Sequence, residues 1–104
     1  MAPRQFPHPD IADVAIEDVL HALSDPVRLG VARQLGREGE ATCAALDAGR
    51  SKSTMAHHFR ILRAAGIVQT RGEGVTHWNT LRRAELDTRF PGLLDAVLTA
   101  GGGR

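Results

Sequence analysis

The chain has 104 residues, a formal net charge of +1, few aromatic residues and no tyrosine. This length suits one domain with a modest core built mainly from aliphatic side chains. No apolar run approaches the roughly 18 residues that a bilayer span needs, and the N-terminus lacks the apolar stretch of a signal peptide. A single cysteine excludes an internal disulfide. Together these features predict a cytoplasmic protein that does not enter a membrane.

The charge is unevenly distributed along the chain. Residues 1–45 hold four arginines against seven acidic residues, whereas residues 46–82 hold six basic residues against two acidic ones. Residues 83–104 are balanced, with three of each. A basic segment beside an acidic one is typical of a protein with a DNA-binding face.

Composition and periodicity predict a single domain over residues 13–100. Residues 1–12 contain three prolines and no hydrophobic period, which predicts a flexible arm. At the other end, the glycine-rich residues 101–104 predict a disordered tail.

Two helices are predicted at the start of the domain. The first begins near Ala15, has apolar residues at helical spacing from Ile16 to Leu23, and stops before Asp25. The second runs from Pro26 to Leu35 and ends at Gly36. Asp25 can cap this helix, and a proline suits the first helical position because its missing N–H would have no partner there.

A polar break over residues 37–40 precedes a short helix at about Thr42 to Ala48. Within this helix Cys43 and Leu46 are placed toward the core. Gly49 and Arg50 then form a turn into the next helix.

Residues 51–66, SKSTMAHHFRILRAAG, predict a helix with two different faces. Ser51 is a good N-cap, and Gly66 stands where a helix ends in the left-handed conformation. The apolar face carries Met55, Phe59, Leu62 and Ala65. The opposite face carries Ser53, Ala56, His57, Arg60 and Ala64. Because this face has no acidic residue and few bulky ones, it suits a helix that enters the DNA major groove. An ordinary amphipathic helix with a basic exterior is the alternative for this segment alone.

Beyond Gly66 the pattern changes to β-branched residues. The segments IVQTR and VTHWNTL flank Gly72-Glu73-Gly74, which predicts a β-hairpin. An isolated hairpin is marginally stable, and Trp78 is predicted to pack it against a helix. A final helical region, broken or restarted at Pro91, carries an apolar stripe toward its end.

The predicted order is α-α-α-α-β-β-α: a mainly α protein with a small β-hairpin. Two short helices joined by a tight turn and followed by a hairpin make a winged helix-turn-helix, with the hairpin as the wing.

The chain resembles the ArsR/SmtB family of bacterial winged-helix regulators. The resemblance covers about residues 15–98 and rests on two stretches, LSDPVRLGVARQL at 23–35 and SKSTMAHHFRILRAAGIVQTRGEGVTHWNTL at 51–81. It implies a homodimeric repressor of transcription, formed through the first and last helices, that binds a palindromic operator in double-stranded DNA. It also implies a small-molecule inducer that relieves repression.

The chain departs from the metal-sensing members of that family. Many of these carry a Cys-x-Cys pair on the helix before the recognition helix, which would fall here at Glu40 and Thr42. Others use Asp and His ligands on the C-terminal helix, but no histidine follows His77. Since Zn(II) or As(III) requires thiolate or imidazole clusters, we expect no metal site and no cofactor.

The predicted DNA contacts lie on the outward helix face and the wing. They are Lys52, Ser53, Thr54, His57, Arg60, Arg71 and His77. Those at the helix N-terminus are placed to bind phosphate or base edges, because free backbone N–H groups and the helix dipole favour anions there. Arg60 is placed to hold a backbone phosphate, and a solvated surface role is the alternative for His57.

Other notable residues are assigned structural roles. His58 borders the apolar stripe and is predicted to be packed and hydrogen-bonded. Arg28 is predicted to pair with Asp25, with a DNA-backbone contact as the alternative. Cys43 is predicted to be a small core residue, with redox sensing as the alternative, because a reactive thiol needs exposure and a lowered pKa.

The apolar stripes of the first and last helices exceed what one small core can bury. We therefore expect them to meet in a two-fold dimer interface. The predicted interface residues are Ile16, Val19, Leu20, Leu93, Leu94, Val97 and Leu98.

Two other classes of function fit the sequence less well. A winged helix can serve as a protein-interaction or dimerisation module, but such modules usually carry an apolar patch where this chain is polar and basic. A catalytic triad of His58, Ser53 and Asp47 needs a cleft and positioning residues that nothing in the sequence indicates, so no enzyme is predicted.

Overall fold

The first two helices are joined as their sequence predicts. The structure, a computed structural model, describes residues 6–100; the predicted tail at 101–104 lies outside this range. Helices α1 (Ile16–Leu23) and α2 (Pro26–Glu38) follow a short 3₁₀ turn, η1 (Ile11–Asp13). The Asp25 carboxylate accepts hydrogen bonds from two backbone N–H groups of the first turn of α2, which confirms the predicted cap.

Helix α2 is longer than predicted because it continues through Gly36. A side-chain Cβ at this position would lie 3.3 Å from Cδ1 of Leu98, so the glycine allows the last helix to approach closely. The helix ends three residues later at Gly39, whose φ is 84°. The prediction of an end at Gly36 was therefore wrong: this glycine serves packing rather than termination.

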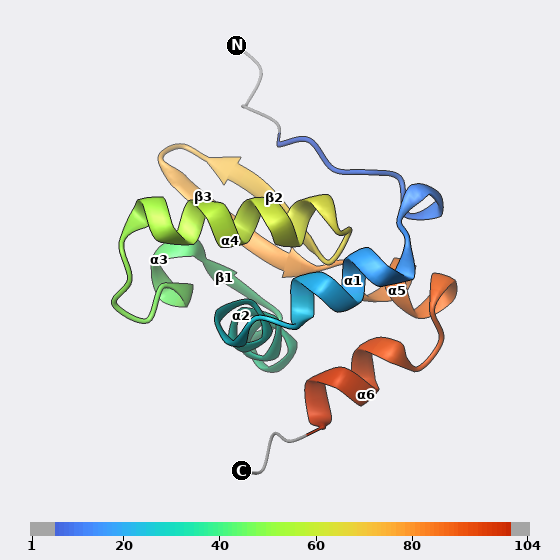
Figure 1. The fold of residues 1–104 in the computed structure, drawn as a ribbon. Helices are drawn as coiled ribbons and strands as arrows, with labels where there is room; N and C mark the ends of the chain where they lie inside the picture. The colour runs from blue at the N-terminus through green and yellow to red at the C-terminus, as the bar shows by residue number, and fades with distance from the viewer. Residues whose placement is uncertain (1–5, 101–104) are drawn as a thin grey trace.

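The sheet has three antiparallel strands in the order β1-β3-β2 (Figure 1). Strands β2 (Val68–Glu73) and β3 (Thr76–Leu81) form the predicted hairpin. Strand β1 (Glu40–Thr42) pairs with β3 and replaces the predicted polar break. Its three residues are too few to show a strand period, and the partner strand lies almost forty positions away, so no local pattern predicts this strand.

Helices α3 (Cys43–Leu46) and α4 (Lys52–Ala64) form the helix-turn-helix. Ser51 caps α4 by accepting a hydrogen bond from the N–H of Thr54. Gly66 follows the end of α4 with a φ of 75°, and a Cβ there would lie 2.8 Å from Cγ2 of Val14. Both predicted limits of this helix are thus confirmed.

The C-terminal region is divided into α5 (Arg83–Arg89) and α6 (Leu93–Thr99). Gly92, just before α6, has a left-handed conformation, which confirms the break predicted at Pro91. No helix within residues 6–100 is long and apolar enough to cross a membrane.

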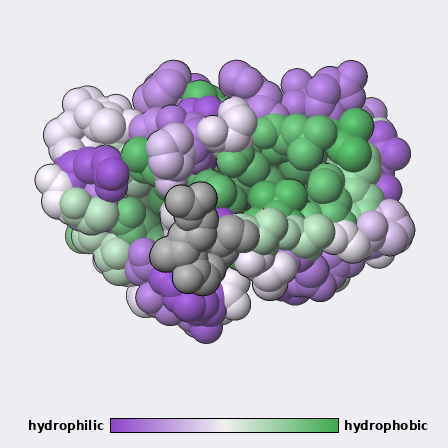
Figure 2. Space-filling view, turned by 60° about the horizontal axis from the view of Figure 1, so that its bottom comes forward, coloured by the Kyte–Doolittle hydropathy of each residue, from purple (hydrophilic) through white to green (hydrophobic). Residues whose placement is uncertain are grey.

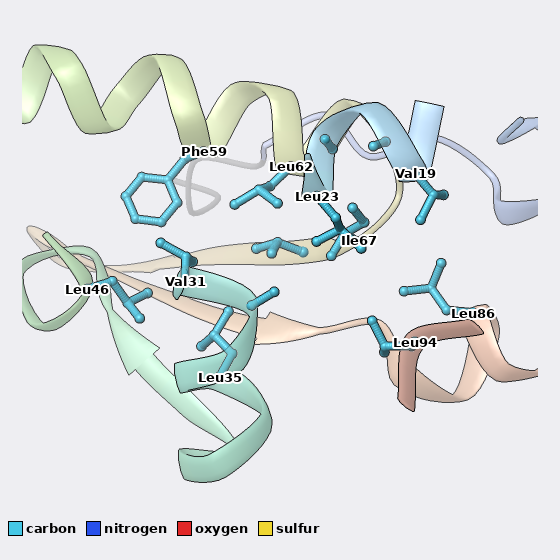
Figure 3. Close-up of a cluster of buried hydrophobic side chains, with 14 of the residues drawn as sticks. Val19, Leu23, Val31, Leu35, Leu46, Phe59, Leu62, Ile67, Leu86 and Leu94 are labelled. Atoms are coloured by element: carbon cyan, nitrogen blue, oxygen red, sulfur yellow. The ribbon is translucent and has the colours of Figure 1, made fainter. Parts of the chain in front are cut away.

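One hydrophobic core joins all six helices and the sheet (Figure 3). Val19 of α1 and Leu94 of α6, both predicted at a dimer interface, are only 1% and 2% exposed. They are core residues of the single chain and cannot offer surface to a second subunit. The other five predicted interface residues are at least partly exposed.

Asn79 connects the three strands at the centre of the sheet and is fully buried. Its Oδ1 accepts a 2.7 Å hydrogen bond from the hydroxyl of Thr70 on β2. Its Nδ2 donates to the carbonyl of Ala41 on β1 at 3.4 Å. Trp78, the residue predicted to fix the hairpin to a helix, is half-buried on the opposite side of β3, so that prediction was wrong.

Candidate nucleic-acid interface

The outward face of α4 is a continuous polar and basic surface. All five residues predicted there are exposed: Lys52, Ser53, Thr54, His57 and Arg60. None of the three that carry ionisable groups forms an ion pair with another residue of the described range 6–100. Their donors are therefore available to an external anion.

The hydroxyl groups at the start of α4 are ordered by the cap. The Ser51 hydroxyl donates to Oγ1 of Thr54 at 2.9 Å while it accepts from the Thr54 N–H at 3.2 Å. Because the Thr54 oxygen already accepts a hydrogen bond from Ser51, the Thr54 hydroxyl can donate its own hydrogen elsewhere. A donor at a helix N-terminus can bind a phosphate oxygen or a base acceptor.

On the wing, Arg71 is less available than the sequence suggested. Its Nε donates to Glu73 at 2.8 Å, and its Nη1 donates to Glu40 of β1 at 3.1 Å. These hydrogen bonds raise the pKa of Arg71. A phosphate would have to replace at least one of the two carboxylates, so the base of the wing is a weaker anion site than the face of α4.

Residues 6–12, part of the segment predicted as a flexible arm, contain contacts with the wing that the sequence did not indicate. The ring of Phe6 packs edge-to-face on exposed His77, with 4.9 Å between centroids. Nε2 of His8 accepts a 3.0 Å hydrogen bond from the backbone N–H of Thr70. This nitrogen must be unprotonated to accept. Partial burial, and then the nearby charges of Arg82 and Arg63, lower the pKa of His8.

His58 is packed and hydrogen-bonded, as predicted, and does not join His57 in the exposed face. Its Nδ1 lies 3.3 Å from Nη1 of Arg28 and 3.8 Å from the carboxylate of Asp25. The expected ion pair between Arg28 and Asp25 is absent within this network. Instead the buried guanidinium donates to backbone carbonyls at the end of α1, the shortest bond being 2.7 Å to Ala22. Asp25 uses its carboxylate on backbone N–H groups, which lower its pKa.

Within residues 6–100, no three His, Cys, Asp or Glu side chains gather closely enough to share a metal ion. Cys43 is half-buried at the margin of the core, and its sulfur lies 3.3 Å from Nδ2 of Asn79.

Comparison with known proteins identifies this arrangement. Residues 23–71, which hold α2, α3 and α4, match a family model described as a helix-turn-helix domain. The chain is 34% identical over 82 residues to the HTH-type transcriptional regulator YceK of Bacillus subtilis, covering 76% of this chain and 82% of that protein. Its fold matches the transcriptional repressor BigR from Xylella fastidiosa with a TM-score of 0.59 at 31% identity, over 72% and 85% of the two chains. The chain belongs to the ArsR family of winged helix-turn-helix regulators.

A solved ArsR family regulator shares the fold at a TM-score of 0.64, over 70% of this chain and 81% of the other, although only 23% of residues are identical. In the present chain, α4 is the recognition helix and the β2-β3 hairpin is the wing. The proteins that the chain matches are transcription regulators, and its helix-turn-helix fold implies that it binds DNA.

Proposed function

We propose that this ArsR-family regulator is a homodimeric repressor that binds a palindromic operator and competes there with RNA polymerase. The observation that supports it most is the exposed face of α4, which presents Lys52, His57 and Arg60 with no acidic residue among them. Such a face is attracted to the phosphates that border a major groove. The chain acts by binding rather than by catalysis.

The proposed dimer uses the apolar surface that the fold leaves exposed. Ile16 and Leu20 of α1 are 43% and 46% exposed. Figure 2 shows a broad hydrophobic area on the side of the molecule where α1 and α6 lie. Leu93, Val97 and Leu98 of α6 are also only partly buried. A patch of this kind is typical of a subunit interface.

Two-fold symmetry explains why a dimer suits this function. An isologous interface through α1 and α6 would present two copies of α4 about 34 Å apart, one turn of B-DNA. Each copy would then contact one half of a palindrome. We propose that the seven predicted side chains on α4 and the wing make these contacts, and that the regulator does not sense metals.

Selection of binding sites from random duplex DNA tests the proposal. We expect enrichment of a palindrome whose half-sites lie about ten base pairs apart. If Lys52 and Arg60 hold phosphates, then K52M and R60M should each remove one contact per subunit and flatten the plot of log Kd against log salt by about two units per dimer. R37M is the matched control, because Arg37 is exposed on α2, away from α4.

Failure to enrich any sequence, with a salt slope near zero, would favour the protein-interaction alternative. A loss of affinity confined to particular base changes, with an unaltered salt slope, would mean that the substituted residue contacts bases instead of phosphates.

A further inference from the structure

A pocket of about 560 Å³ runs along α4 from Lys52 near the start of the helix to Arg63 near its end, and it is bounded by α3, the tip of the wing and Phe6 of the arm. Figure 1 shows α3 beside the start of α4 and the hairpin running alongside the helix. Its apolar lining includes Phe6, Met55, Ala56 and Phe59. This volume is within the range of sites that bind small molecules, which are mostly apolar with a few placed polar groups.

The polar group that distinguishes this pocket is the guanidinium of Arg63, which is half-buried in its wall. It lies over the ring of Phe6, 4.7 Å from the centroid, and its Nη1 is 3.4 Å from the hydroxyl of Thr70. No carboxylate of residues 6–100 lies within 4.0 Å of it. Burial lowers the pKa of Arg63; the nearby Cys43 opposes this shift, and Arg60 adds to it. A partly desolvated cation without a counter-ion is stabilised by an incoming anion.

The remaining charges of the pocket also favour an anion. Lys52 and His77 lie in its lining, and Asp47 is the one acidic residue there among those described. A carboxylate can accept two parallel hydrogen bonds from a guanidinium, which gives orientation as well as affinity. The aromatic and thioether side chains then suit a flat apolar body.

We propose that this pocket binds a small organic carboxylate with an aromatic or similarly apolar body, held by Arg63, and that this ligand is the inducer. The inducer role, unlike the binding of the carboxylate, rests on the proposed function. Lys52 and His77 line the pocket and are also proposed DNA contacts. A ligand that engages them, or that separates α4 from the wing, therefore weakens operator binding.

The single thiol of the chain reports occupancy of the pocket, because Cys43 lies in its lining. The probe is 2-naphthoate, and 2-naphthamide is its uncharged analogue. With the whole chain and no DNA present, we expect about 1 mM 2-naphthoate to slow alkylation of Cys43 by monobromobimane about fivefold, and the amide to slow it less than about twofold.

Three variants test the role of the guanidinium. R63M should remove the protection by 2-naphthoate, whereas R37M, which alters an exposed arginine on α2, should keep it. A44F fills the pocket from the exposed surface of α3 and should abolish protection without touching Arg63. Equal protection by acid and amide, protection that persists in R63M, or no protection at about 10 mM would overturn the site.

Operator affinity tests the coupling. We expect 2-naphthoate to raise the Kd for the selected operator about tenfold in the parent protein and less than about twofold in R63M. Protection of Cys43 without any change in Kd would overturn the inducer role. A protein that is protected but selects no DNA would contradict only the proposed function, and one that selects an operator but is never protected would contradict only this inference.

Discussion

Replacing Asn79 with alanine is expected to destabilise the domain by about 2–4 kcal/mol, although Asn79 is not itself a proposed DNA contact. The 2.7 Å bond from the Thr70 hydroxyl contributes about 1 kcal/mol net, because both groups are buried. Its loss leaves the Thr70 hydroxyl proton without a partner at 3% exposure, which costs about 1–3 kcal/mol more. The longer contacts to Ala41 and Cys43 add little.

Urea unfolding followed by far-UV circular dichroism measures this loss, at one fixed protein concentration so that any dimerisation is constant. N79A should be compared with T70V and with the double variant. T70V removes the hydroxyl that N79A leaves unpaired. We therefore expect the double variant to lose about 1 kcal/mol less unfolding free energy than the two single variants lose together. Q69A is the control: Gln69 is the exposed neighbour of Thr70 on β2, and its substitution should change the unfolding free energy by less than about 0.5 kcal/mol. A loss below about 0.5 kcal/mol for N79A, or strict additivity with T70V, would refute this account of the sheet.

Three further predictions concern assembly, pH and metals. L20E combined with V97E should give a monomer by sedimentation that keeps its helical content and loses operator binding; a dimer of unaltered affinity would contradict the α1–α6 interface. Because the pKa of His8 is lowered in the fold, neutral His8 stabilises the contact of residues 6–12 with the wing. This stabilisation is complete above about pH 6.5 and is lost as the pH falls below that value. The amide-exchange protection factor of Thr70, whose N–H donates to His8, should therefore drop as the pH falls below about 6.5, and H8Q should remove that pH dependence; constant protection in the parent protein would contradict this prediction. Millimolar EDTA or micromolar Zn(II) should leave operator Kd nearly unaltered, and a shift of about tenfold would contradict the proposal that the regulator does not sense metals.

The features predicted correctly from the sequence are those encoded locally. The Asp25 and Ser51 caps, the Gly66 terminus and the hydrophobic period of α4 depend on residues within a few positions of one another. Local hydrogen bonds and helical spacing are visible in any single sequence. The exposed face of the recognition helix followed from that period.

What could not be predicted depends on partners distant in sequence. Strand β1 exists because residues 40–42 pair with β3, and His8 is held by an N–H on β2. Arg28 donates to the carbonyls that end α1 in preference to the carboxylate three residues before it, because the fold places both carbonyls within reach. The helical period of α4 did not predict a role for Arg63. Its guanidinium is half-buried because Phe6 of the arm and the wing pack around it, and these contacts come from distant parts of the chain.

The buried guanidinium of Arg28 adds a polar link between two helices that share the hydrophobic core. On one side it holds the last carbonyls of α1, the helix whose exposed leucine and isoleucine are proposed to face a second subunit. On the other side it contacts His58, which lies on the recognition helix one residue from the proposed DNA contact His57. A change in the angle between two paired α1 helices would thus be passed through one rigid, planar side chain to the helix that enters the groove. Lysine at this position would keep the charge but could not reach both helices at once, so this polar link between the subunit-facing helix and the recognition helix would be lost.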